Sequence, residues 1–271
     1  MRNIEYAILS AQRAAIERLP DHLVGCNLVY LHRLMLAAAG IYLRPGARVL
    51  DFGCGSGRAV YDYRDCGFDA YGFDIADYVE RRNPTDTDFF RFSLTGRPAH
   101  IPDYQVNATD YRLDFEDQTF DFVFSNSVFE HVQNHDLALR EIARVLKPGG
   151  IAIHTFPPRY SLIEPHTFVP LGGAITNPIW YRLWAMLGIR NQFQRGMTVA
   201  EVVNANLQYS RTGVNYVPVK SLVRTARHHF TETILAPYLW TIGGRRHPLI
   251  QFSLVASLYS RIVLVVLLLH R

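Results

Sequence analysis

The stretch that decides the fold is VLDFGCGSGRAV, residues 49–60. Its apolar start predicts the end of a buried strand, and Asp51 follows at the carboxyl end of that strand. Three glycines then alternate with other residues, at Gly53, Gly55 and Gly57. Glycines placed in this way let the backbone approach a ligand closely. The stretch therefore predicts a strand, a ligand-binding loop and a helix that begins near Arg58.

Strands and helices alternate on both sides of this loop. Strands are predicted at residues 47–51, 70–74, 120–125, 151–156 and 230–235, and helices at 4–18, 22–39, 58–65, 136–146 and 219–229. This alternation is typical of a doubly wound, mostly parallel α/β sheet, whose ligands bind at the carboxyl ends of the strands. Residues 51–57, 74, 125–131 and 155–158 fall at those ends.

The chain divides into four segments of one integrated domain. We expect an N-terminal helical cap over residues 1–44, a cofactor-binding core over 45–156, a lid inserted over 157–218, and a C-terminal helix and strands over 219–271 that complete the sheet. The proposed lid is rich in proline and aromatic residues, which suits a substrate-covering insertion. Residues 79–105 contain three prolines and are predicted to be irregular.

The spacing of the glycines argues against a dinucleotide ligand. The dinucleotide fingerprint separates its glycines by two and then three positions, whereas both separations here are two. Asp51 beside the loop would repel a phosphate and suits an ammonium group. Asp74, 21 residues after Gly53 and at the end of the next predicted strand, can accept both hydroxyls of a ribose. S-adenosylmethionine offers a ribose and an amine without a phosphate, so it is the predicted ligand.

Two downstream motifs agree with that ligand: DFEDQTFDFVFSNSVFEHV at 114–132 and LREIARVLKPGG at 139–150. With the glycine loop and Asp74 they resemble the class I S-adenosylmethionine-dependent methyltransferases, in particular the ubiquinone-biosynthesis-like superfamily. The resemblance covers residues 47–156. It implies a Rossmann-like sheet of seven strands, with the last strand antiparallel.

The resemblance also assigns roles to individual residues. Asp51 and the three glycines would line the methionine end of the cofactor, and Asp74, with Ile75 beside it, would bind the ribose. Ser125 and Asn126 would face the methionine and the transferred methyl. In VNATDY, residues 106–111, the adenine contact falls on Asn107 and Ala108, with Asp110 as the competing acid.

Methyl transfer to a weakly acidic sugar hydroxyl needs a base. His166, in EPHTFVP just past the fifth predicted strand, is the preferred base, and Glu164 would orient it or act itself; the alternative is a surface histidine in a proline-rich turn. His131 is a further catalytic candidate, although EHV is widespread in this superfamily and also fits a structural or cofactor-adjacent role. His154, in the middle of a strand, is predicted to belong to the core. The sequence shows no cluster of metal ligands, so no metal is predicted; a Mg²⁺-assisted sugar methyltransferase is the alternative, which no motif supports.

The lid bears a second resemblance. FPPRYSLIEPHTFVPLGG, residues 156–173, is similar to a segment of methyltransferases from bacterial polysaccharide and glycolipid gene clusters. It implies O-methylation of a sugar hydroxyl on a glycan or glycolipid intermediate, with Trp180, Tyr181 and Trp184 available to stack on sugar rings or to pack within the lid. The alternatives are a quinone, a polyketide or another lipophilic acceptor, and a cofactor-binding pseudo-methyltransferase that serves as a partner subunit.

Charge is distributed unevenly along the chain. Residues 1–150 contain 16 Lys+Arg and 21 Asp+Glu, whereas residues 151–271 contain 12 and 3. The basic half predicts an acceptor with an anionic group or peripheral contact with a membrane surface. Because the chain has only two lysines and no basic run, a nucleic acid is disfavoured.

Two further sequence features concern the cellular compartment and the C-terminal segment. Three cysteines without CxxC spacing and an N-terminus without an apolar leader predict a cytoplasmic protein. SLYSRIVLVVLLLHR, residues 257–271, is predicted to be a central strand, with a membrane-surface helix as the alternative. Its uninterrupted apolar run of 262–269 is far shorter than the roughly 20 residues of a membrane span.

Overall fold

The computed structural model describes residues 27–38, 40–92, 112–235, 258–259 and 261–271. Three of the residues predicted to bind the cofactor, Asn107, Ala108 and Asp110, lie outside the described residues, as does the helix predicted at 4–18. All other candidate site residues fall inside them.

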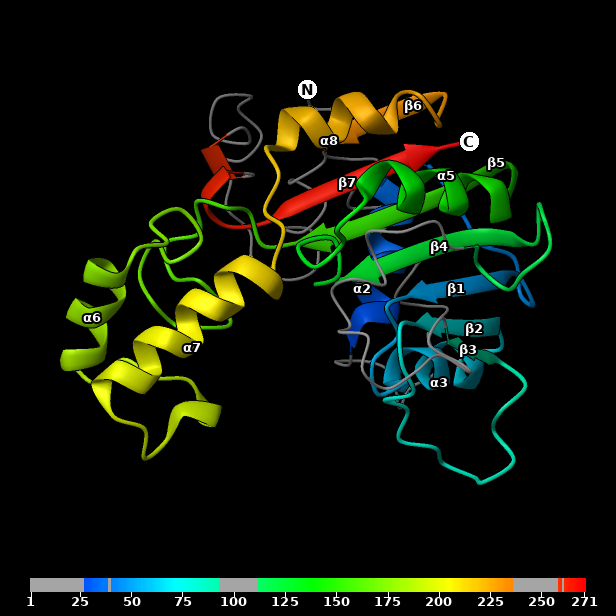
Figure 1. Ribbon diagram of the computed structural model, residues 1–271. Helices are drawn as coiled ribbons and strands as arrows, with labels where there is room; N and C mark the ends of the chain where they lie inside the picture. The colour runs from blue at the N-terminus through cyan, green and yellow to red at the C-terminus, as the bar shows by residue number, and fades with distance from the viewer. Residues whose placement is uncertain (1–26, 39, 93–111, 236–257, 260) are drawn as a thin grey trace.

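The core is a sheet of seven strands in the order β3-β2-β1-β4-β5-β7-β6. The strands are β1 (Arg48–Phe52), β2 (Asp69–Asp74), β3 (Phe90–Phe92), β4 (Phe120–Asn126), β5 (Leu146–Phe156), β6 (Glu232–Leu235) and β7 (Val265–His270). Neighbours from β3 to β5 pair in parallel, while β7 is antiparallel to both β5 and β6. The predicted doubly wound, mostly parallel fold is confirmed (Figure 1).

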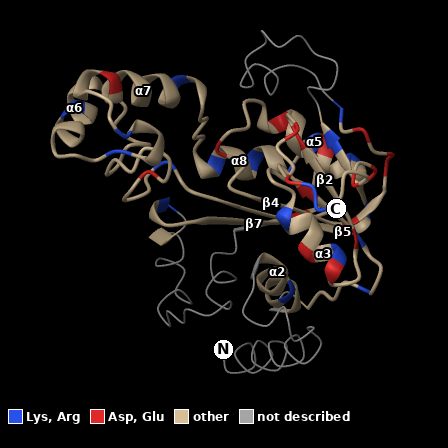
Figure 2. Cartoon of the chain, turned by 90° about the horizontal axis from the view of Figure 1, so that it is seen from below, with Lys and Arg blue, Asp and Glu red and all other residues tan. Residues whose placement is uncertain are grey.

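Helices cover both faces of the sheet, as Figure 2 shows. One face carries α2 (Asn27–Ala38) and α3 (Arg58–Asp65), whose apolar residues share a core cluster with alternate residues of the strands. The other face carries α5 (His135–Val145) and α8 (Val219–Ala226), which contribute to a second cluster. Two buried layers explain why the inner strands are apolar on both faces.

The apolar tail forms a central strand. β7 lies between β5 and β6, with Ile151 opposite His270 and Phe156 opposite Val265. Residues 265, 267 and 269 belong to the cluster under α5 and α8, and residues 266 and 268 to the cluster under α2 and α3. The prediction of a strand is therefore confirmed for residues 265–270, and the membrane-surface helix is wrong for them, whereas residues 258–259 and 261–262 of the same tail are helical. Among the described residues, no helix has the length and apolarity needed to cross a membrane.

The residues after β5 form a small unit beyond the carboxyl ends of the parallel strands (Figure 1). It contains α6 (Pro178–Met186), the 3-10 helix η2 (Gln192–Gln194) and α7 (Val199–Thr212). Tyr181 is fully buried in its core, and Trp180 and Trp184 pack against that core. The expectation that Tyr181 stacks on a sugar is therefore wrong, because its ring holds α6 against α7.

Three local predictions also need correction. Residues 79–105 were expected to be irregular, yet β3 forms within them and pairs with β2. The pattern did not predict α7, which begins at the capping residue Thr198. β5 begins at Leu146, so the Lys147–Gly150 segment lies within the strand, next to a register shift against β4.

Candidate active site

The glycine loop connects β1 to α3 and is pinned to the end of β2. The backbone N–H groups of Gly53 and Cys54 both donate to the carbonyl of Phe73, at 2.8 and 3.0 Å. Gly53 has a φ of +88°, and a Cβ there would lie 2.3 Å from the side chain of Val128. Only glycine fits this position, because both the backbone angle and the space exclude a side chain.

Two carboxylates stand at this loop. Asp51 is buried, and burial together with the charge of Asp74 raises its pKa. Asp74 accepts hydrogen bonds from the backbone N–H of Gly55 and of Ile75, both at 2.7 Å. A Cβ on Gly55 would meet nothing within 4 Å, so the space beside the loop is open. A cationic amine would relieve the repulsion between the acids, and a ribose would find acceptors, so these residues fit S-adenosylmethionine.

Cys54, inside the loop, is a packing residue. It is buried against Gly72 of β2, where a Cβ on that glycine would lie 2.8 Å from its sulfur. Burial and the nearby carboxylates raise the pKa of its thiol, which suppresses the reactive thiolate.

Ser125 and Asn126 end β4 in different environments. Ser125 is fully buried, and its hydroxyl shares a 2.8 Å hydrogen bond with Nδ1 of His154. Asn126 is exposed, and its Oδ1 accepts from the hydroxyl of Thr155 at 2.8 Å. His154 is a core residue, as expected; burial lowers its pKa to about 3.

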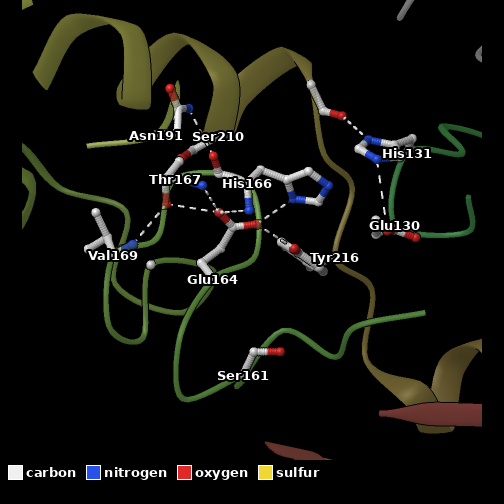
Figure 3. Close-up of polar contacts among 12 residues, drawn as sticks. Glu130, His131, Ser161, Glu164, His166, Thr167, Val169, Asn191, Ser210 and Tyr216 are labelled. Carbon is white, nitrogen blue, oxygen red and sulfur yellow. Dashed lines mark hydrogen bonds and ion pairs between the residues drawn. The ribbon is translucent and has the colours of Figure 1, made fainter. Parts of the chain in front are cut away.

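Glu164 and His166 form a tight pair in the loop that follows β5 (Figure 3). The Nδ1–H of His166 donates to Oε1 of Glu164 at 2.6 Å, and its backbone N–H donates to Oε2 at 3.0 Å. Thr167 donates to Oε2 through both its backbone N–H and its hydroxyl, and the hydroxyl of Tyr216 donates to Oε1 at 2.7 Å. The geometry thus matches a base oriented by a carboxylate.

These bonds keep Glu164 charged despite its burial. Burial alone would raise the pKa of this carboxyl, but the hydrogen bond and positive charge of His166, with the bonds from Tyr216 and Thr167, outweigh burial and lower the pKa to about 2. A carboxylate can only accept, so Nδ1 of His166 carries the proton of this bond. In neutral His166 the lone pair is therefore on Nε2.

His131 lies next to this pair. Its ring centroid is 4.9 Å from that of His166, and its Nδ1–H donates to the carbonyl of Gly213 at 2.6 Å. Burial lowers the pKa of His131. The structure therefore brings the three predicted catalytic residues together, from segments that are more than 30 residues apart.

Glu130 belongs to the same cluster and was not predicted. Its residue is 1% exposed, and its Oε1 lies 3.9 Å from Nε2 of His131. Burial raises its pKa to about 7. The sequence signal was an acid next to a histidine soon after a predicted core strand. Because both residues belong to the widespread EHV motif, the acid was not singled out.

Val128 links the cluster to the cofactor loop. Val128, whose side chain would clash with a Cβ on Gly53, is only two residues before Glu130.

Two cavities are candidates for the acceptor site. The larger, about 650 Å³, is lined by Arg48 and Thr119 at the opposite, amino-terminal edge of β1 and β4. The smaller, about 230 Å³, is lined by Glu164, Thr167 and Tyr216. The smaller one adjoins the cluster and is the candidate acceptor cavity.

The sheet order and the glycine loop define a Rossmann-like methyltransferase fold. The profile of the family described as "Methyltransferase domain" matches residues 28–209, more than half of the 271 residues. The chain belongs to this family. It contains a methyltransferase domain, and the predicted cofactor, S-adenosylmethionine, is confirmed.

Several relatives share part of the chain. A ubiquinone biosynthesis O-methyltransferase of Chelativorans sp. is 26% identical over 64% of this chain and 64% of its own length. A sterol 24-C-methyltransferase of Schizosaccharomyces pombe is 32% identical over 40% of this chain and 27% of its own. An S-adenosylmethionine-dependent methyltransferase structure from Mesorhizobium loti matches 86% of this chain and 94% of its own, with a TM-score of 0.48 and 14% identity. The chain spans less than two thirds of the length of these two sequence relatives.

Proposed function

We propose that this methyltransferase methylates a hydroxyl group, on a sugar of a glycan or glycolipid intermediate, by base-assisted in-line displacement. The observation that carries the proposal is the Glu164–His166 pair, because Glu164 lines the acceptor cavity and the ring of His166 packs against that of His131. A sugar hydroxyl is too weakly acidic to react without help. An imidazole held in one tautomer by a carboxylate provides that help.

The chain's own residues divide the work between binding and proton transfer. Asp51 and the glycine loop hold the amine end of the cofactor, and Asp74 holds the ribose. When bound, S-adenosylmethionine supplies an electrophilic methyl carbon. Nε2 of His166 would accept the proton of the acceptor hydroxyl. Glu164 stabilises the imidazolium that results. Alignment of the two reactants contributes most of the acceleration.

The acceptor cavity supports a polar, anionic acceptor. Besides Glu164 and Thr167 it is lined by Arg159, Tyr209 and Ser210. Hydroxyls and a guanidinium group suit a sugar that carries a phosphate or carboxylate, because Arg binds such groups bidentately. At about 230 Å³ the cavity accommodates one sugar ring or a ring of similar size.

A quinone or another lipophilic acceptor is the second candidate. The relatives named for ubiquinone biosynthesis, and a demethylmenaquinone methyltransferase of Renibacterium salmoninarum that is 33% identical over 44% of each chain, favour it. A phenol is more acidic than a sugar hydroxyl and depends less on a base. The effect of removing His166 therefore separates the two candidates.

We also propose that the protein works in the cytoplasm, with peripheral contact at the inner membrane surface. The basic half of the chain supports this, and so does α6, which exposes Ile179, Leu183 and Met186 on the outside of the lid unit. An exposed apolar face beside Arg182 and Arg190 suits an anionic lipid surface.

The experiment that tests the function compares cells with and without the gene after feeding methyl-labelled methionine. We expect a glycan or glycolipid that gains the mass of one methylene group plus the label only when the gene is present. Restoration by wild-type protein but not by His166→Ala supports the proposal. A labelled quinone in place of a glycan would favour the second candidate, and no labelled product would favour a cofactor-binding subunit without catalytic activity.

A further inference from the structure

Three donor groups meet where the lid unit joins the core. Glu130 and His131 follow β4, and His166 lies in the loop that follows β5. One carboxylate oxygen and one ring nitrogen from each histidine all lie within 4.8 Å of one another. Donor atoms bound to one ion at about 2.0–2.2 Å lie roughly 3–4 Å apart, so a contraction of about an ångström would place all three on one ion.

The hydrogen bonds of both histidines favour the tautomer that binds a metal through Nε2 when the ring is neutral. Nδ1 of His131 donates to a backbone carbonyl, and Nδ1 of His166 donates to the carboxylate of Glu164. Since neither partner can donate, the lone pair of each neutral ring is on Nε2. Metal-binding histidines in proteins almost always have this second hydrogen bond, to a carboxylate or a carbonyl, which fixes the ring and raises its basicity.

Glu130 supplies the independent observation. Both of its carboxylate oxygens are buried and have no hydrogen-bond partner among the described residues. Leaving a buried carboxyl without a partner costs free energy, so such a group normally binds something. Its neighbours in the cluster are one ring nitrogen from each of the two histidines. A proton could satisfy one of these groups, but a divalent cation would satisfy all three.

We propose that Glu130, His131 and His166 bind a divalent transition-metal ion such as Zn²⁺ or Mn²⁺. Two imidazoles and one carboxylate suit these ions and leave coordination positions open. Because the ligands come from the core and from the loop after β5, the ion ties the two together.

The proposed metal site goes beyond the proposed function, and the two share one atom, Nε2 of His166. A metal ion and a proton compete for Nε2 of His166. With the ion bound, the acceptor hydroxyl would lose its proton to solvent because the ion lowers its pKa, and His166 would act as a ligand in place of a base. Glu164 then serves as a positioning residue for His166.

The test uses the full chain, stripped of metal with a chelator and titrated with Co²⁺, whose visible absorption reports coordination by nitrogen and oxygen. We expect one ion per chain, competition by Zn²⁺, and a higher Tm with the ion bound. Glu130→Gln and His166→Asn should each weaken binding by more than about a hundredfold, and Glu164→Gln by about 10–100-fold. His228→Ala, which changes an exposed histidine of the surface, should bind as the wild type does.

The inference fails if the wild-type chain shows no such spectrum, or if Glu130→Gln and His166→Asn bind Co²⁺ as well as the wild type. Thermal unfolding of each variant shows that it is folded, and His131→Asn replaces any variant that is not. The Co²⁺ spectrum does not depend on methyl transfer. Methyl transfer by metal-stripped protein would support the proposed function and show that it does not need the ion. Metal binding without any methyl transfer would support the metal site and contradict the proposed function.

Discussion

At the scale of single residues, three buried acids show how neighbours decide the charge of a carboxyl. Glu164 accepts five hydrogen bonds, so its pKa falls to about 2. Glu130 has no hydrogen-bond partner among the described side chains, and burial raises its pKa to about 7. Asp51 is buried beside Asp74, whose charge adds to the effect of burial. The first acid orients a histidine, while the other two are suited to receive a cation.

Gly53 gives the sharpest prediction for the cofactor loop. Gly53→Ala places a methyl group 2.3 Å from Val128 at a φ of +88°. We expect it to weaken S-adenosylmethionine binding by on the order of tenfold or more, about 1.4 kcal/mol, and to lower the free energy of unfolding by about 1–3 kcal/mol. Titration calorimetry and urea denaturation measure the two effects.

Gly46→Ala is the matched control. Gly46 has a similar φ of +74°, but a Cβ there would meet nothing within 4 Å. This variant should lose about 1 kcal/mol of stability from backbone strain alone and keep its cofactor affinity. Equal loss of cofactor affinity in both variants would show that backbone strain, and not the close approach to Val128, causes the loss.

The site residues could be predicted from sequence only where a local pattern carries them. The glycine loop, Asp74 and the EPHTFVP segment are continuous motifs, so Glu164 and His166 could be found without the fold. The role of Glu130 depends on what surrounds it in space, which a sequence does not show. The sequence also does not show that the hydroxyl of Ser125 pairs with His154 of the neighbouring strand, because that contact depends on how the strands are paired.

At the scale of elements, hydrogen bonds join the loop that carries His166 to later parts of the chain. The amide of Asn191 donates to the carbonyl of His166 at 2.9 Å, and Tyr216, after α7, donates to Glu164. The position of the Glu164–His166 pair therefore depends on how α6 and α7 pack.

Tyr216→Phe removes one of these contacts and leaves the ring in place. Because a hydrogen bond to a charged group contributes about 1.5–3 kcal/mol, we expect a loss of about that size in the free energy of unfolding. Methyl transfer should fall by less than in His166→Ala, because four bonds to Glu164 remain. Urea denaturation and initial rates measure these effects. A Tyr216→Phe variant as stable as the wild type would show that this bond does not hold the loop.

Sequence patterns predicted long elements better than short ones. β7 was predictable because a strand buried on both faces needs an unbroken apolar run. β3 has three residues, too few for any alternation, and it forms because β2 offers an open edge. α7 was missed because its polar residues face outward and its apolar contacts are with α6, a partner that the pattern alone does not identify.

At the scale of the whole molecule, buried histidines make stability depend on pH. His32 of α2 packs on Phe122 and Phe124 and shares a hydrogen bond with Tyr63 of α3, while His154 lies in β5. Burial lowers the pKa of each histidine to about 3. Below pH 6.5 the unfolded chain therefore binds protons that the folded chain does not, so stability is lost as the pH falls from 6.5 towards 3.

Replacing one of them should reduce this dependence. Each histidine contributes a slope of about 1.4 kcal/mol per pH unit between those values. His32→Phe should remove one such slope while it keeps the aromatic packing. Urea denaturation at several pH values from 4 to 7 measures it. An unchanged slope in His32→Phe would mean that this histidine is protonated in the folded protein.

The most direct test of the account is methyl transfer in vitro from labelled S-adenosylmethionine to a glycolipid extract of cells that lack the gene. We predict label in an alkali-stable methyl ether on a sugar with the wild type and with His228→Ala, and a rate lower by about a hundredfold or more with His166→Ala. Label in a quinone or an ester, or an undiminished rate with His166→Ala, would contradict it.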